Sequence, residues 1–212
     1  VCVARFALLP PFFSPRVCTH RAPLVNVWIR SYPGVEKKVQ CVSANSTAGD
    51  LFFVGCDVHV ENGDSSGETL SANGKGNLVI GFNEEADCGG AGQCKRTGSH
   101  NLVVGIGNAY SASGGIVSGS DNILDGDLAV LLGGRDNDAS GFESVVAGGY
   151  LNEASGDVSV VAGGRNNDAS GDTSVVAGGR NNDATGGISV VAGGRGNDAS
   201  GIQSLVAGGR LN

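Results

Sequence analysis

Methionine is absent from the 212 residues of this chain, and aromatic residues make up only 5% of it. Large apolar side chains are therefore scarce, and each residue has little apolar surface to bury. This scarcity argues against an ordinary globular core. Glycine, in contrast, occurs 37 times, far above its usual share of about 7%.

Long apolar runs and signals for membrane or nucleic-acid binding are also lacking. No stretch of about 18 apolar residues exists, so no membrane insertion is expected. The N-terminal run "VCVARFALLPPFF" is interrupted by Pro10 and Pro11 and makes a poor signal peptide. Residues 99–212 contain five arginines, no lysine and twelve acidic residues, which account for the formal net charge of −7. Such an acidic tract repels phosphate backbones, so we expect no nucleic-acid partner.

Groups for catalysis are few. The only histidines are His20, His59 and His100, and none lies in the regular repeats described below. A Ser/His/Asp set chosen from so many serines and aspartates has no specificity. The glycines precede neither a helix start nor GK[ST], which excludes a P-loop. We therefore expect no enzyme and no cofactor.

All six cysteines precede residue 95, and none forms a CxxC pair. Cys88 and Cys94 flank the short stretch "CGGAGQC" and form the candidate disulfide; free cysteines in a poorly ordered region are the alternative. Disulfides form outside the cytosol, so the cysteines favour an extracellular or cell-surface location over zinc binding.

The dominant feature is a 15-residue repeat. From Ser144 the chain reads SVVAGGYLNEASGDV, SVVAGGRNNDASGDT, SVVAGGRNNDATGGI and SVVAGGRGNDASGIQ, and it ends on SLVAGGRLN. An earlier unit begins at Ala129, and a fainter one at Gly114 keeps Gly119, Asn122 and Gly126 at the same spacing. β-Branched runs separated by Gly-Gly, Asn-Asp and Ser-Gly are typical of brief strands joined by corners. We expect an all-β fold, a parallel β-solenoid in which each repeat forms one rung.

Stacking in register places identical residues above one another at about 4.8 Å. Asparagine amides can bond along such a column, and asparagine also tolerates corner geometry. The predicted structural column contains Asn137, Asn152, Asn167, Asn182 and Asn197. A column of arginines would repel itself, so we expect the acids three positions further on, such as Asp168 after Arg165, to interleave with it. Such exposed pairs are worth about 0 to 1 kcal/mol each.

Adjacent valines in "SVVAG" face opposite sides of a strand. If one valine column fills the interior, the other forms an apolar stripe outside, which monomers rarely leave exposed. The stripe predicts self-association, unless a segment of a longer parent chain covers it. One of the two valine columns contains Val145, Val160, Val175 and Val190.

Three regions follow from this pattern. Residues 1–40 show no period and are expected to be an irregular or poorly ordered leader, and residues 41–98 form a strand-containing cap with the cysteine loop. Within that cap, residues 50–63 read as one or two strands, with alternation at Val58 to Val60. "GNLVIGFN" and "HNLVVGIGN", which contain Asn77 and Asn101, look like irregular first rungs separated by the cysteine loop. Residues 99–212 form the solenoid, which ends within a repeat and is expected to be part of a longer chain.

The units resemble the head repeats of the YadA-like trimeric autotransporter adhesins. "SVVAGG" and "NDASG" occupy the places of that family's Ser-Val-Ala-Ile-Gly strand and Ala-x-Ala-x-Gly return, over about residues 99–212. "GNLVIGFNE" and "HNLVVG" are similar to the start of mostly uncharacterised bacterial glycine-rich repeat proteins. The resemblance implies a left-handed parallel β-roll, a homotrimer, and binding to host or matrix surfaces. The family's usual repeat is slightly shorter, and its isoleucine position is alanine here.

Two other binding functions remain as alternatives. "GGRGND" matches the start of the calcium-binding GGxGxDxUx nonapeptide of RTX β-rolls, with Gly194, Gly196 and Asp198 as candidate calcium residues. The next Gly-Gly follows only after a whole longer repeat, and Ser200 stands at the apolar position of the nonapeptide. An ice-binding β-roll is the other alternative, because a hydroxyl column runs through Ser140, Ser155, Ser170, Thr185 and Ser200.

Overall fold

The computed structural model describes residues 42–45, 50–54, 57–63, 67–82, 84 and 95–212, and these residues form strands, turns and loops without a helix. The predictions for residues 1–40 and for the Cys88–Cys94 disulfide lie outside these ranges. The chain forms two compact units, Val1–His59 and Val60–Asn212.

The described residues of the first unit contain one antiparallel strand pair. Strand β1 (Val42–Asn45) pairs with β2 (Asp50–Phe53), with Asn45 opposite Asp50. Among the described residues of the stretch 50–63, Asp50–Phe53 alone form a strand. Val58 and Val60 are exposed and lie in no strand, because a short alternating run needs a paired neighbour to stay extended.

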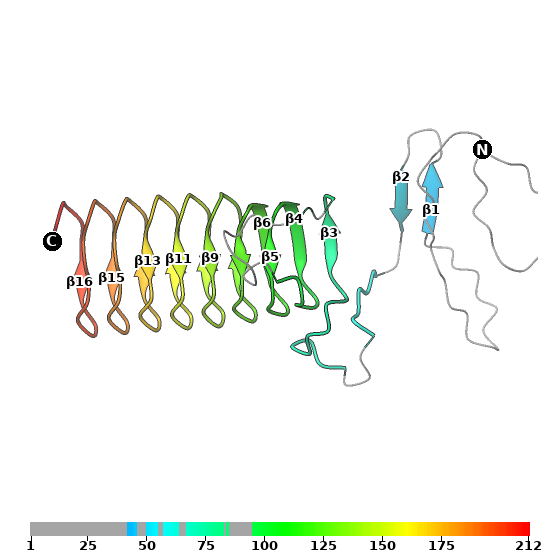
Figure 1. The fold of residues 1–212 in the computed structure, drawn as a ribbon, viewed down its shortest axis with the longest axis horizontal. Coiled ribbons are helices and arrows are strands. Elements are labelled where there is room, and N and C mark those ends of the chain that lie inside the picture. The colour runs from blue at the N-terminus through cyan, green and yellow to red at the C-terminus, as the bar shows by residue number, and fades with distance from the viewer. Residues whose placement is uncertain (1–41, 46–49, 55–56, 64–66, 83, 85–94) are drawn as a thin grey trace, which may run out of the picture. The chain divides into compact units, whose positions relative to one another are not determined.

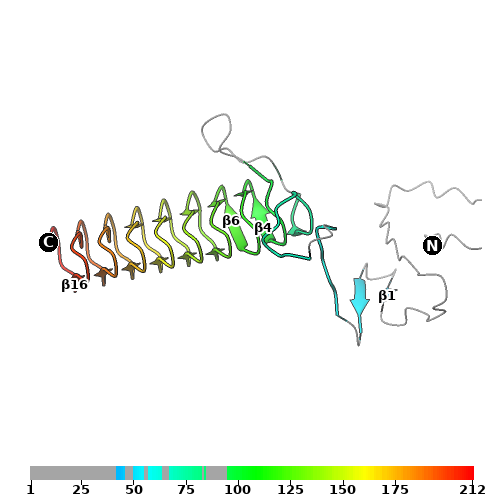
Figure 2. The same cartoon turned by 90° about the horizontal axis from the view of Figure 1, so that it is seen from below.

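The second unit is a parallel β-solenoid, and Figures 1 and 2 show its rungs side by side along one axis. The long sheet contains nine parallel strands in the order β3 (Leu78–Ile80), β4 (Leu102–Ile106), β6 (Ile116–Ser120), β8 (Val130–Leu131), β10 (Val145–Val146), β12 (Val160–Val161), β14 (Val175–Val176), β15 (Val190–Val191) and β16 (Leu205–Val206).

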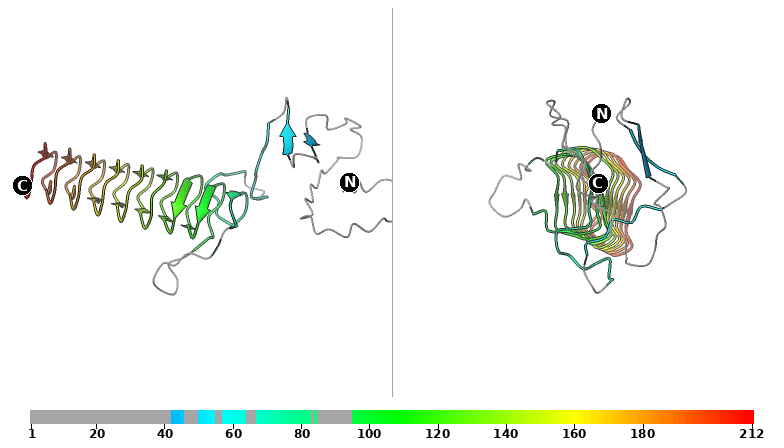
Figure 3. Two further views of the ribbon diagram at one scale, coloured as in Figure 1. Left: turned by 90° about the horizontal axis from the view of Figure 1, so that it is seen from above. Right: turned by 90° about the vertical axis from the view of Figure 1, so that its right-hand side faces the viewer.

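The short sheet forms another side of each rung. It contains β5 (Ala109–Tyr110), β7 (Ile123–Leu124), β9 (Asp138–Ala139), β11 (Glu153–Ala154) and β13 (Asp168–Ala169). Single bridges continue it from Asp168 to Asp183 and Asp198. The end-on view in Figure 3 shows that successive rungs superpose closely. The predicted all-β solenoid with 15-residue rungs is confirmed from Val130 onward, where Val130, Val145 and Val160 pair in sequence.

The earlier rungs differ in length from the regular repeat. Ile116 pairs with Leu102 and with Val130, and each interval is one position shorter than the regular repeat. Leu78 pairs with Leu102 across a much longer interval. The alignment of the unit at Gly114 with the regular repeat would have placed Ile116 opposite Leu131, so its strand half is wrong by one position. The reason is that Val117 pairs with Leu131 and Ser120 pairs with Arg135, and the segment from Val117 to Ser120 is one residue shorter than the segment from Leu131 to Arg135.

The additional residue in each regular rung is a glycine. Val117 pairs with Leu131 and Ser120 with Arg135, so one of the two glycines before Arg135 has no counterpart in β6. Gly133 has a φ of 156°, and a Cβ added to it would meet no atom within 4 Å. Gly134 faces the next rung, since a Cβ there would clash with the Gly149 oxygen. The inserted residue interrupts the strand, which is 5 residues long in β6 and 2 in β8.

The core is a stack of small side chains. Val146 and its equivalents from Val117 to Val191 face inward and have no exposed surface, and the alanines of the short sheet complete the filling. Val145 and its equivalents point outward, and most of them are half-exposed. The apolar core of each regular rung is therefore little more than one valine and one alanine, which could not fold without neighbouring rungs.

Candidate functional site

A ladder of buried asparagines joins the rungs. The backbone N–H of Asn167 donates to Oδ1 of Asn152 at 3.1 Å, and Asn167 Nδ2 donates to the carbonyl oxygens of Gly163 at 2.9 Å and Gly179 at 3.2 Å. The side chain of each asparagine thus satisfies backbone groups in its own rung and in the next one, and its backbone N–H is bonded to the asparagine side chain of the rung before. The column of Asn137, Asn152, Asn167, Asn182 and Asn197 is at most 1% exposed and continues to Asn122 and Asn108.

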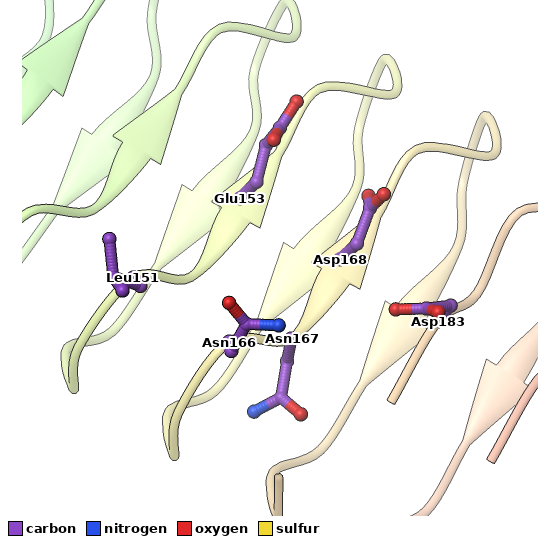
Figure 4. A pocket seen from close by; sticks show the side chains of 6 residues that line it. All are labelled: Leu151, Glu153, Asn166, Asn167, Asp168 and Asp183. Carbon is purple, nitrogen blue, oxygen red and sulfur yellow. The ribbon is translucent and has the colours of Figure 1, made fainter. Parts of the chain in front are cut away.

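A column of carboxylates follows the outer side of the short sheet. Glu153, Asp168 and Asp183 occupy successive rungs, as Figure 4 shows, beside a shallow hollow of about 220 Å³. Burial raises the pKa of Asp138 from 3.8 to about 6, and the charges of Glu153 and Asp125 raise it in the same direction, while a Ser140 hydroxyl opposes them. The pKa of Asp168 and of Asp183 is also raised, first by burial and then by neighbouring carboxylates.

The carboxylate column offers no cluster of metal ligands. Among the described residues, no three His, Cys, Asp or Glu side chains lie close enough to hold one metal ion. The buried Oδ1 atoms of Asp138 and Asp168 accept no hydrogen bond. The column is therefore an array of partly desolvated acids that favours protonation.

The arginines stack on a separate line. Arg135, Tyr150, Arg165 and Arg180 form successive parallel bridges, and the guanidinium carbons of Arg135 and Arg165 lie 5.0 and 5.4 Å from the Tyr150 ring centre. The predicted interleaving with acids three positions further on is wrong. The one ion pair in the described part of the chain joins Arg135 Nε to Asp136 Oδ2 at 3.3 Å. A corner separates each arginine from the carboxylate column, and the buried asparagine lies between them.

The calcium candidates lie in three different structural positions. Gly194 faces the Gly209 backbone, Gly196 is a left-handed corner residue with a φ of 69°, and Asp198 belongs to the carboxylate column. The Gly194 oxygen accepts hydrogen bonds from the Arg180 N–H and from Asn182 Nδ2. The backbone oxygen that a calcium loop would supply is thus used within the solenoid.

Two serine columns differ in exposure. The predicted column that includes Ser140 and Ser170 points outward beside the carboxylates. The sequence pattern did not single out a second column, in which the hydroxyls of Ser144, Ser159, Ser174 and Ser189 are buried and have no hydrogen-bond partner. The feature of the sequence that could have revealed this column is the serine that begins each SVVAG run.

The outer face of the long sheet has one column that is apolar along the whole sheet and a second that is apolar from Leu132 onward. One column, defined by strand pairing, contains Leu78, Leu102, Ile116, Val130, Val145, Val160, Val175, Val190 and Leu205. Beside it, Leu132 and the exposed alanines Ala147, Ala162, Ala177 and Ala192 form a second column. We call these two columns the outer face. No charged side chain belongs to it.

A comparison with models of protein families gave no match, and a comparison with curated proteins also gave none. The described residues contain no helix of the length and apolarity needed to cross a bilayer. The function proposed below therefore rests on the solenoid and its surfaces.

Proposed function

We propose that this chain is a non-catalytic structural rod, part of an adhesin or attachment fibre on the outside of the cell. The observation that carries the proposal is the outer face, whose first column is continuous over nine strands of the long sheet. A contiguous apolar face of this length is rare on monomers and is typical of an interaction surface. The buried columns are filled by short side chains and asparagine ladders, so the interior serves rung stacking.

The partner at the outer face is another copy of the same chain, and the assembly is a homotrimer. Every copy presents the same straight column, so parallel copies bury it along the whole rod without a change of contact from rung to rung. The resemblance to YadA-like head repeats supports three copies. The spacing of Leu102, Ile116 and Val130 also approaches the shorter repeat of that family. A host-surface or matrix ligand binds elsewhere on the rod.

The test is the mass of the folded chain in solution, measured by sedimentation equilibrium. We expect three copies for the full chain. The variant Val145→Lys/Val175→Lys places charge on the half-exposed outer column and should give folded monomers. The variant Ser140→Lys/Ser170→Lys adds the same charge to exposed positions on the short-sheet side and should stay trimeric.

Circular dichroism of each variant separates dissociation from unfolding. A monomeric wild-type chain would overturn the proposal, and so would a Val145→Lys/Val175→Lys variant with unchanged mass. A ligand-binding screen on the trimer against matrix proteins and glycans then tests the attachment role.

A further inference from the structure

The outer face has two edges, and each edge carries its own column of residues. The entry edge lies before the strands. It contains residues whose backbone oxygens each accept a hydrogen bond from the following rung, namely Ser113, Asp127, Phe142, Asp157, Asp172 and Gly187. Ile202 stands at the same place in the next repeat. The exit edge lies after the strands, where parallel bridges join Ser120, Arg135, Tyr150, Arg165, Arg180, Arg195 and Arg210. Both edges carry charge, in contrast to the face between them.

The two edges match rung by rung. An acid at the entry edge accompanies an arginine at the exit edge in three rungs, which contain Asp127 with Arg135, Asp157 with Arg165, and Asp172 with Arg180. In the one rung with tyrosine at the exit edge, Tyr150, the entry edge carries Phe142. The rung before these pairs is neutral at both edges, and charge begins at both edges in the same rung. The matching ends at Arg180, because Gly187 and Ile202 stand in the rungs of Arg195 and Arg210.

Contacts within one chain do not explain this matching. Asp172 and Arg180 form no ion pair with each other, and the only ion pair of the described residues joins Arg135 to Asp136. Asp157 Oδ1 accepts a bond from the Phe142 N–H, which leaves Oδ2 for an outside cation. Arg180 and Asp172 are both exposed. The matched charges of these rungs are therefore not neutralised by each other within the single rod.

Parallel copies around a common axis bring the exit edge of one copy to the entry edge of the next. At equal height, Arg180 then meets Asp172 of the neighbour, and Tyr150 meets Phe142. Antiparallel rods related by a two-fold axis across the rod would instead bring arginines to arginines, which is unfavourable. We propose that the two edges form a complementary pair between copies, so that the rods associate in parallel and with equal rungs at equal height.

This inference rests on the proposed parallel association through the outer face and adds the residue pairs at its edges and their register. The test uses Asp172 and Arg180, since neither takes part in an ion pair within the described chain. Association of the full chain is measured by sedimentation. Arg180→Asp places like charges at every interface and should weaken association about tenfold or more. Asp172→Arg should do the same, and the double swap Asp172→Arg/Arg180→Asp should restore the wild-type value.

Two control variants test the register. Arg195→Asp changes the same edge in a rung whose entry residue is Gly187, so it should alter association by less than about threefold. Asp172→Arg/Arg195→Asp has the same charges as the double swap but on different rungs, and it should not restore association. If the wild type is a trimer and every variant also forms trimers, the matched swap has nothing to restore, and the edge pairing alone would be overturned. A monomeric wild type would overturn the proposed function and the edge pairing together.

Discussion

The backbone N–H of Asn167 donates to the side-chain Oδ1 of Asn152, one rung earlier, at a distance of 3.1 Å. The same contact recurs between Asn182 and Asn167 and between Asn197 and Asn182. A side chain thus provides a continuous hydrogen-bonded line at a corner between the two sheets. Backbone pairing holds the sides of the rungs together, and amides hold this corner.

Replacement of one ladder asparagine should destabilise the rod. Asn167→Ala leaves the Asn182 N–H and the Gly163 oxygen without these partners in the interior. Buried unpaired groups cost about 1 to 3 kcal/mol each, so we expect a loss of about 3 kcal/mol in the free energy of unfolding, measured by urea denaturation. Asn166→Gly is the control, since Asn166 is exposed and glycine stands at its place in Gly196. Equal losses for both variants would contradict the role of the ladder.

Stability should increase as the pH falls from 7 toward 4. The folded-state pKa of Asp138 is about 6, above its unfolded value of 3.8, so the protonated carboxyl is favoured by folding. Its contribution is complete below about pH 4 and is lost as the pH rises through about 6. The raised pKa values of Asp168 and Asp183 act with the same sign.

Asp138→Asn isolates this effect, because the amide has the same shape and no charge. We expect it to raise the free energy of unfolding at pH 7 by up to about 3 kcal/mol. It should also reduce the change of that free energy with pH between pH 4 and 6. Thermal unfolding across pH measures both quantities. Glu143→Gln, which removes an exposed carboxylate outside the carboxylate column, is the control for the loss of one negative charge. A destabilised Asp138→Asn variant at pH 7 would contradict the assignment.

Removal of a buried serine hydroxyl should stabilise the solenoid. Ser174 Oγ is buried without a hydrogen-bond partner, and an earlier rung has Ala129 in the same column with no exposed surface. Ser174→Ala should therefore raise the free energy of unfolding by about 1 kcal/mol. Ser170→Ala, at an exposed position, should change it by less than about 0.5 kcal/mol. A loss of stability in Ser174→Ala would show that the hydroxyl has a partner.

Calcium should not change the folding of the rod. Gly194, Gly196 and Asp198 lie on different columns, and the Gly194 oxygen already accepts two hydrogen bonds. We expect the same unfolding temperature in EDTA and in millimolar calcium. An increase of several degrees with calcium, lost in Asp198→Asn, would revive the calcium-binding alternative.

Deletion of a whole rung should be tolerated. Without Ser174 to Ile188, Val160 can pair with Val190 by the contact it now makes with Val175. The rod should fold and shorten by about 4.8 Å, as measured by small-angle scattering. Deletion of only a third of that rung should unfold the rungs around it, because every column shifts. Identical behaviour of the two deletions would contradict nearest-neighbour stacking.

The repeat length predicted the solenoid, because equivalent residues can stack along one axis only if each repeat is one turn. Alternation along a strand also predicted that Val145 and Val146 face opposite sides, and Val146 is buried whereas Val145 is half-exposed. Periodicity could not place Arg165 relative to Asp168, since both recur with the same period and the corner between them depends on backbone geometry. The register of Ile116 was missed because its rung lacks one glycine, and a fixed period cannot reveal a missing residue.

The pairing of Leu78 with Leu102, across an interval well beyond one regular repeat, shows how the rod accommodates extra sequence. The N–H of Gly98 bonds to the Tyr110 oxygen, so the return side of this rung is in register, and the surplus residues enter between Ile80 and Lys95. All later rungs keep their pairing. The pairing of the sheets therefore fixes where each rung stands, while the length of chain between Ile80 and Lys95 can exceed that of a regular rung without changing the rungs that follow.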